Sequence, residues 1–158
     1  MLRYVILLFV MLNVIPGNPV ALMMNFEEIS HIVSSFCSEH PSVTAAYVFG
    51  SVAKGCSENP KDVDVAVLLN PKDSRSFDIL LFITAIEESL GCRADVVVLN
   101  RAGELLKYEV RRHGRLVFDR SHEFRKNFEI RSRKMYEDFL YLHKKYVNAV
   151  LYGGNKNG

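Results

Sequence analysis

The stretch FGSVAKGCSENPKDVDVAVLL, residues 49–69, decides the fold of this chain. An apolar segment ends at Gly50-Ser51, a ten-residue loop follows, and the next apolar segment begins with Asp62-Val-Asp64. Residues two apart in a strand point to the same face, so the two carboxylates should lie side by side. Neighbouring carboxylates at a strand edge are costly unless a cation neutralises them. The stretch therefore predicts two strands joined by a loop, with a cation-binding edge on the second.

Helical and strand patterns alternate along the rest of the chain. Asn25 is a suitable N-cap for the first helix, and Gly91 is a suitable C-terminal stop for the second. We expect an α+β fold with a mixed central β-sheet flanked by helices and a long C-terminal helix. The predicted helices are 25–40, about 73–90, 102–114 and 122–152, and the predicted strands are 43–50, 62–70, 94–100 and 115–119.

Length and charge favour a single domain with an uneven charge distribution. The chain has 158 residues, and we place one domain at 25–152 and a disordered tail at 153–158. Residues 1–100 carry six Lys/Arg and eleven Asp/Glu, whereas the remainder carries fourteen and seven. A solvated basic helix face is the simplest explanation of the excess. The three cysteines, which lack metal or disulfide spacing, favour a cytoplasmic protein with reduced thiols (Cys37, Cys56, Cys92).

The first 24 residues form an apolar segment that permits three interpretations. Residues 2–15 are apolar apart from Arg3, Tyr4 and Asn13, which is short for a membrane-spanning helix. We rank a misassigned start first, with translation beginning at Met23 or Met24. A signal or anchor segment is second, because no clean cleavage site follows. A folded core element is third.

A third carboxylate, Asp95, opens the strand predicted at 94–100. If that strand neighbours the one that begins at Asp62, Asp95 joins Asp62 and Asp64 at one edge of the sheet. Carboxylate oxygens are ligands that Mg²⁺ prefers, and three of them suit a two-metal displacement. A solvated ion pair between Asp95 and the nearby Arg93 is the alternative.

The Gly-Ser loop is the candidate phosphate site. Gly50 allows backbone to approach a phosphate closely, and Ser51 adds a hydroxyl and an N–H. Lys54 could screen phosphate charge, although simple exposure is an equal alternative. Gly55 permits the loop to return. The nucleotide-binding candidates are thus Gly50, Ser51, Lys54 and Gly55, and the metal and catalytic candidates are Asp62, Asp64 and Asp95.

Taken together, these motifs resemble the GSx10DxD signature of the polymerase-beta-like nucleotidyltransferase superfamily, which implies the nucleotidyltransferase fold. The size of the domain and the segments HGRLVFD and FEIRSRKMYEDF look like minimal nucleotidyltransferases (MNT), the antitoxins that accompany HEPN-domain toxins. The resemblance covers about 25–145. It departs from the family's pattern at Lys61, where a small residue often stands, and at Val52, where longer or basic residues are common.

The resemblance implies a Mg²⁺-dependent protein adenylyltransferase that moves AMP from ATP to a tyrosine hydroxyl of a cognate HEPN toxin. It implies that Asp62 and Asp64 bind two metal ions, and that Asp95 binds one and helps to deprotonate the acceptor. Gly50 and Ser51 would hold the terminal phosphates. No direct nucleic-acid binding is expected.

Two other functions stay open. A non-catalytic antitoxin would neutralise its toxin by occlusion, and a related transferase would use a small-molecule or tRNA acceptor. The final helix bears on partners, because about 30 residues of helix span about 45 Å, more than a domain of this size readily covers. We therefore expect its far end to pack on a partner chain, either a toxin or another copy.

Overall fold

The computed structural model describes residues 24–55 and 60–152. Predictions for residues 1–23, for Cys56 and for the tail after 152 lie outside the described residues. In chain order the elements are α2 (Phe26–Glu39), β1 (Val43–Phe49), α3 (Gly50–Ala53), β2 (Asp62–Leu69), α4 (Ile79–Leu90), β3 (Arg93–Val98), the 3-10 helix η1 (Leu99–Arg101), α5 (Glu104–His113), β4 (Arg115–Asp119) and α6 (His122–Tyr152).

The four strands form one mixed sheet in the order β3-β2-β1-β4. β1 pairs antiparallel with β2 and with β4, whereas β2 and β3 pair in parallel. A parallel pair needs a crossover connection, which α4 provides between β2 and β3. The predicted α+β class with a mixed central sheet is confirmed.

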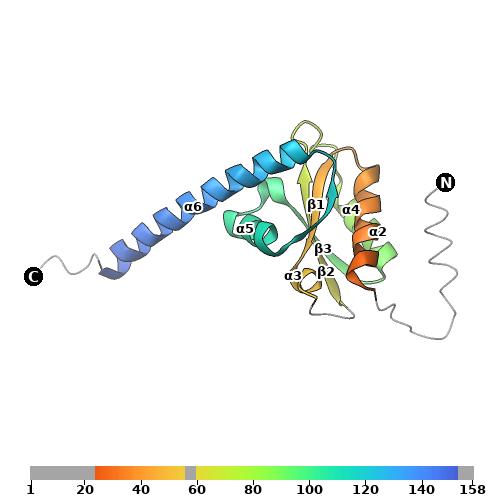
Figure 1. The fold of residues 1–158 in the computed structure, drawn as a ribbon, viewed down its shortest axis with the longest axis horizontal. Coiled ribbons are helices and arrows are strands. Elements are labelled where there is room, and N and C mark those ends of the chain that lie inside the picture. The colour runs from red at the N-terminus through yellow and green to blue at the C-terminus, as the bar shows by residue number, and fades with distance from the viewer. Residues whose placement is uncertain (1–23, 56–59, 153–158) are drawn as a thin grey trace, which may run out of the picture.

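Helices cover both faces of the sheet (Figure 1). On one face α2 and α4 enclose a core that includes Val33, Val65 and Phe82, each fully buried. On the other face α5 and the start of α6 cover a second cluster that includes Leu68 and Val110. Because alternate residues of a strand point to opposite faces, Val65 and Leu68 of β2 reach different clusters. The sheet is thus buried on both sides, which accounts for its largely apolar strands.

Helix α2 begins as the sequence predicts. The Asn25 side chain accepts a hydrogen bond from the Glu28 N–H at 3.0 Å, and the Glu28 carboxylate accepts one from the Asn25 N–H at 2.9 Å. This reciprocal capping box satisfies two N–H groups that the helix itself leaves unpaired.

Helix α4 begins later than predicted. The prediction that the helix opens near Asp73 is wrong, because residues 71–76 form turns and the helix starts at Ile79. Asp78 is the N-cap, and its carboxylate accepts from the N–H groups of Leu80 and Leu81. Short polar side chains in the turn, such as Ser76 bonded to the Asp73 carbonyl at 2.7 Å, compete with helix formation.

The strand β3 is also shorter at its end than predicted. It stops at Val98, and the residues that follow form η1. The side chain of Asn100 then replaces a strand residue as the partner of Leu69: its Oδ1 accepts from the Leu69 N–H at 2.8 Å and its Nδ2 donates to the Leu69 carbonyl at 2.9 Å. The backbone groups at the end of β2 are therefore paired without a longer β3.

Helix α6 has 31 residues and continues well beyond the rest of the domain (Figure 1). Its first part packs on α5 and β1. Farther along the helix, large apolar side chains are exposed, including Leu142 and Tyr146. Among the described residues, no helix is both long enough and apolar enough to cross a membrane.

Candidate active site

The candidate active site lies where β2 and β3 begin. In the parallel register of these strands, Asp64 lies opposite Asp95. Directly opposed residues share a face, and Asp62 shares that face because it stands two residues before Asp64. The structure therefore brings Asp62, Asp64 and Asp95 to one edge of the sheet, on the face that α5 and α6 cover farther along the strands.

The carboxylates at this edge act on one another electrostatically. The pKa of Asp64, which is half-buried, is raised first by desolvation and then by the negative charges of Asp95 and Asp62. Burial and like charges both disfavour the ionised form of an acid. Asp62 and Asp95 are themselves exposed. The edge therefore combines one half-buried carboxylate, Asp64, with two carboxylates that are exposed to solvent, Asp62 and Asp95.

Gly50 packs directly against Asp64. Its φ is +67°, a left-handed conformation that side chains disfavour, and a Cβ placed on it would overlap the Asp64 Oδ2. Asp64 also lies opposite Phe49, the residue before Gly50, in the register of β1 and β2. Glycine at this position therefore allows the backbone of the loop to come within contact distance of the central carboxylate.

The other predicted phosphate ligands follow Gly50 in the chain. Ser51 is exposed in α3, a single turn of helix that packs on β1 and β2. Lys54 and Gly55 come next and are exposed, and Gly55 has the positive φ that a returning chain requires. Ser51 thus lies in the helix α3, next to Gly50, which packs against Asp64. Lys54 and Gly55 follow the end of that helix.

Arg93 contacts a different carboxylate from the one that the sequence suggested. The alternative interpretation paired it with Asp95, but the contact that the structure shows joins Arg93 Nε to Asp62 Oδ1 at 4.0 Å. Both side chains are largely exposed, so the pair is weak. The register explains the change, because Arg93 lies opposite Asp62 across the strands.

The edge is compatible with a divalent cation in its donor chemistry. Among residues 24–55 and 60–152, no three His, Cys, Asp or Glu side chains are arranged so that they could hold a metal ion together. Mg²⁺, however, typically takes only one or two protein carboxylates, and water and phosphate oxygens complete its shell. Asp64 and Asp95 on adjacent strands meet that requirement, and a cation between them would relieve the repulsion that Asp95 exerts on Asp64.

Cys92 lies close enough to this edge for the Asp62 charge to affect it. Its pKa is raised by desolvation and then by the charges of Asp62 and Glu87. Because the thiolate is the nucleophilic form, a raised pKa makes this thiol a poor nucleophile. Cys92 is therefore a poor candidate for a nucleophile at this edge.

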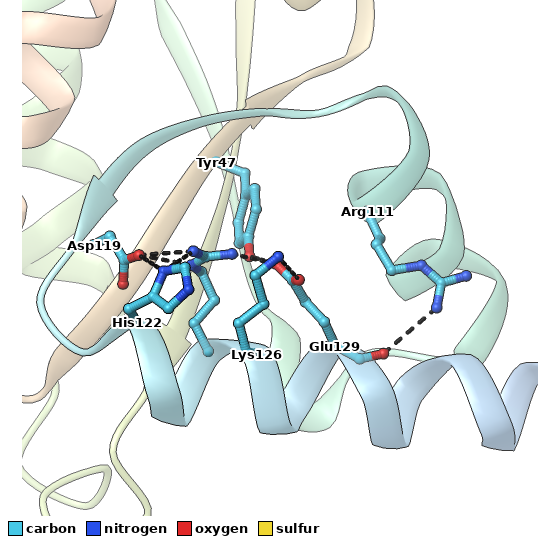
Figure 2. A network of polar contacts seen from close by, with 7 residues as sticks. Tyr47, Arg111, Asp119, His122, Lys126 and Glu129 are labelled. Atoms are coloured by element: carbon cyan, nitrogen blue, oxygen red, sulfur yellow. Dashed lines mark hydrogen bonds and ion pairs between the residues drawn. The ribbon is translucent and has the colours of Figure 1, made fainter.

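Sequence reasoning missed a polar network on the same face of the sheet (Figure 2). Tyr47 in β1 donates to Glu129 in α6 at 2.8 Å, and Arg125 bridges Glu129 and Asp119 at 2.7 and 2.8 Å. The Arg125 side chain is 7% exposed, although the sequence places it in a run of basic residues. The spacing of four residues could have suggested the Arg125–Glu129 pair, but not the burial of Arg125 or the bond from Tyr47, which lies far away in the chain. The network fixes α6 to β1.

A comparison with protein families identifies the chain. Residues 31–123, more than half of the sequence, match the family described as Polymerase beta, Nucleotidyltransferase. The chain belongs to this family. The match spans the Gly-Ser loop and all three carboxylates, so this nucleotidyltransferase carries the signature at the edge described above.

Solved structures with the same fold include toxin–antitoxin complexes. One, a toxin-antitoxin with AMP-PNP, has a TM-score of 0.65 and 19% identity, covering 77% of this chain and 98% of the other. A second, a tri-AMPylated HEPN toxin of Shewanella oneidensis in complex with MNT antitoxin, has a TM-score of 0.62 and 18% identity and covers 80% and 98%. A third, the toxin-antitoxin MntA-HepT, has a TM-score of 0.61 and 17% identity and covers 79% and 98%.

At this identity the solved structures show the fold of the nucleotidyltransferase and not its activity. The predicted nucleotidyltransferase fold and the likeness to MNT proteins are confirmed at that level. A comparison with curated proteins found no significant match.

Proposed function

We propose that this nucleotidyltransferase is an antitoxin that transfers AMP from ATP to a tyrosine hydroxyl of a cognate HEPN-class toxin. The family membership supports nucleotidyl transfer. The toxin–antitoxin structures that share the fold, one with AMP-PNP and one with an AMPylated toxin, support the substrate and the acceptor. The observation that carries the proposal is the pairing of Asp64 with Asp95 beside Gly50.

The chain's own residues divide the work between the phosphates and the acceptor. The backbone at Gly50 and the hydroxyl of Ser51 hold the terminal phosphates of ATP. Asp64 and Asp95, which lie opposite each other across the strands, would hold Mg²⁺, with Asp62 beside them at the same edge. When bound, the metal supplies charge neutralisation for the phosphates and activation of the attacking oxygen.

In the reaction the tyrosine oxygen attacks the α-phosphorus of ATP. The bond between that phosphorus and the bridging oxygen of the β-phosphate breaks, and pyrophosphate leaves. Asp95 accepts the hydroxyl proton, because it is exposed and so can be reached by a side chain of another protein. Asp64, which is more buried, is held against Gly50 and stays fixed.

The test is the transfer of label from ATP to a cognate HEPN-class toxin in the presence of Mg²⁺. Label at the α-phosphate should appear on the toxin, whereas label at the γ-phosphate should not. Asp64→Asn should lower the rate by about a hundredfold or more, because it removes a ligand and leaves the shape unchanged. Glu88→Gln, an exposed acid on α4, is the matched control and should retain full activity.

Two results would contradict the proposal. If γ-labelled ATP marks the toxin, the protein transfers a different part of the nucleotide. If no label transfers while the toxin is still neutralised, and Asp64→Asn neutralises it equally well, the protein is a binding antitoxin.

A further inference from the structure

The second half of α6 presents an apolar stripe that the described part of the chain leaves uncovered. Four side chains, hereafter the distal stripe, recur at alternating spacings of four and three residues and are 54%, 45%, 63% and 68% exposed: Met135, Phe139, Leu142 and Tyr146. Spacing of this kind places them along one seam of a helix, as in the core positions of a coiled coil. A seam with this exposure is an interaction surface.

The distal stripe continues a face that is already used within the domain. Phe128 packs on the second core cluster, and Ser132, one helical turn before the stripe, is buried. Met135 follows at the next position of the same seam. The later part of α6 extends away from the sheet (Figure 1). The distal stripe therefore continues, along the exposed part of α6, the same helix face that packs on the domain at Phe128 and Ser132.

The centre of the stripe is held in place before any partner arrives. The ring of Phe139 stacks between Tyr136 and His143, with centroids 6.4 and 5.8 Å away. Tyr136 in turn stacks on Tyr108 of α5 at 4.2 Å. Aromatic side chains that are already ordered lose less freedom on binding, so Phe139 is suited to anchor an interface.

We propose that the distal stripe pairs with the same stripe of a second copy of this chain, with the two α6 helices antiparallel. In that arrangement Phe139 of one copy lies against Leu142 of the other, and Met135 lies against Tyr146. Each layer then joins an aromatic ring to a flexible or branched aliphatic side chain. The contact is two-fold symmetric and closes on itself.

The charges beside the stripe favour the antiparallel arrangement. Asp138 and Lys145 each stand just before a core position, at Phe139 and Tyr146, and both are exposed. Antiparallel helices bring the two positions together across the seam, which gives two Asp138–Lys145 pairs related by symmetry. Parallel helices would instead place Asp138 near His143 and Lys145 near Val150, which offers less charge complementarity.

The shape of the molecule also favours antiparallel helices. The sheet and the other helices lie at the N-terminal end of α6 (Figure 1). Antiparallel pairing places the two domains at opposite ends of the helix pair, whereas parallel pairing would bring them together at one end. This inference concerns a surface away from the carboxylates and does not depend on the proposed function.

The test is the mass of the full chain in solution, measured by sedimentation over a wide range of protein concentrations. We expect a dimer that dissociates on dilution. The double variant Phe139→Glu/Leu142→Glu should be monomeric throughout, and circular dichroism should show that it stays folded because both side chains are exposed. As a matched control, Leu80→Glu/Leu81→Glu on α4, where the side chains are 72% and 69% exposed, should leave the dimer intact.

Charge exchange tests the direction of the helices. Asp138→Lys and Lys145→Asp should each weaken the dimer about tenfold, because each replaces two attractions by two repulsions. The double exchange Asp138→Lys/Lys145→Asp should restore wild-type dimerisation.

Three results would overturn the inference. A wild-type chain that is monomeric at every concentration would remove the second copy as the partner. Failure of the double exchange to restore the dimer would rule out the antiparallel pairing. A monomeric wild-type chain that loses toxin neutralisation with Phe139→Glu/Leu142→Glu would assign the stripe to a different protein.

Discussion

The hydroxyl of Tyr47 donates a hydrogen bond of 2.8 Å to the carboxylate of Glu129, across 82 positions of the chain. Tyr47 belongs to β1, in the middle of the sheet, and Glu129 belongs to α6. With Arg125 as a third member, this contact determines where α6 leaves the domain (Figure 2). The direction in which the distal stripe is presented therefore depends on this contact.

Loss of the Arg125 guanidinium should destabilise the fold strongly. Arg125→Met removes the buried guanidinium that Glu129 and Asp119 share and leaves only the half-exposed Lys126 beside Glu129, and the cost of such a break is about 3 kcal/mol. Arg133→Met is the matched control on the same helix, because the Arg133–Glu137 pair is exposed and should contribute about 0.5 kcal/mol or less. Urea unfolding measures both. Equal effects of the two substitutions would show that the network is not a stabilising core element.

Acid should weaken the same network. Burial alone would raise the pKa of Glu129, but hydrogen bonds from Tyr47 and Arg125 outweigh it, and the pKa is lowered. A carboxyl with a lowered folded-state pKa contributes stability that is present above its unfolded pKa and is lost as pH falls through its folded pKa. Unfolding free energy measured from neutral to acidic pH should therefore fall less steeply for Glu129→Gln than for the wild type. A parallel pair of curves would contradict this.

The ionisation of Asp64 should change the stability of the fold with pH in the opposite direction. Because its folded-state pKa is raised, the folded protein binds more protons than the unfolded one in that window, so stability falls as pH rises through it. Asp64→Asn should then raise the melting temperature at neutral pH. The gain should be about 1 °C, because the side chain is only half-buried and solvent screens part of the repulsion.

The same variant separates repulsion from metal binding. Adding Mg²⁺ should raise the melting temperature of the wild type, since an ion that binds only the folded state stabilises it. Mg²⁺ should raise the melting temperature of Asp64→Asn by a smaller amount. If Asp64→Asn is less stable than the wild type when both are measured without Mg²⁺, the Asp64 carboxylate stabilises the fold and the predicted repulsion is wrong.

Gly50→Ala should damage both stability and activity. The new methyl group would overlap the Asp64 carboxylate and would also occupy a left-handed conformation, at a combined cost of about 2 kcal/mol or more. Gly91→Ala is the matched control, because its φ is nearly the same, +66°, but nothing lies within 4 Å of its added Cβ. It should lose about 1 kcal/mol and retain transferase activity. Full activity in Gly50→Ala would show that the close approach to Asp64 is dispensable.

The sequence alone was sufficient for most of the fold because the signals that specify its elements are local. The capping box at Asn25, the Gly91 stop and the apolar runs of β1 and β2 are each read within a few residues. The start of α4 was predicted wrongly from Pro71 and Asp73, because the residues that follow Pro71 form turns and Asp78 caps the helix instead.

For the candidate site, the sequence determined which residues carry the chemistry: glycine at a close approach, two carboxylates on one face of a strand and a third at the start of the next. Only the tertiary structure decided that Asp95 lies opposite Asp64 and that Arg93 faces Asp62, because strand register is a relation between segments distant in sequence. The same holds for the bond between Tyr47 of β1 and Glu129 of α6, beside which Arg125 is buried. Side-chain type and spacing are properties of a local segment, whereas pairing and burial arise only when distant segments share the same small volume.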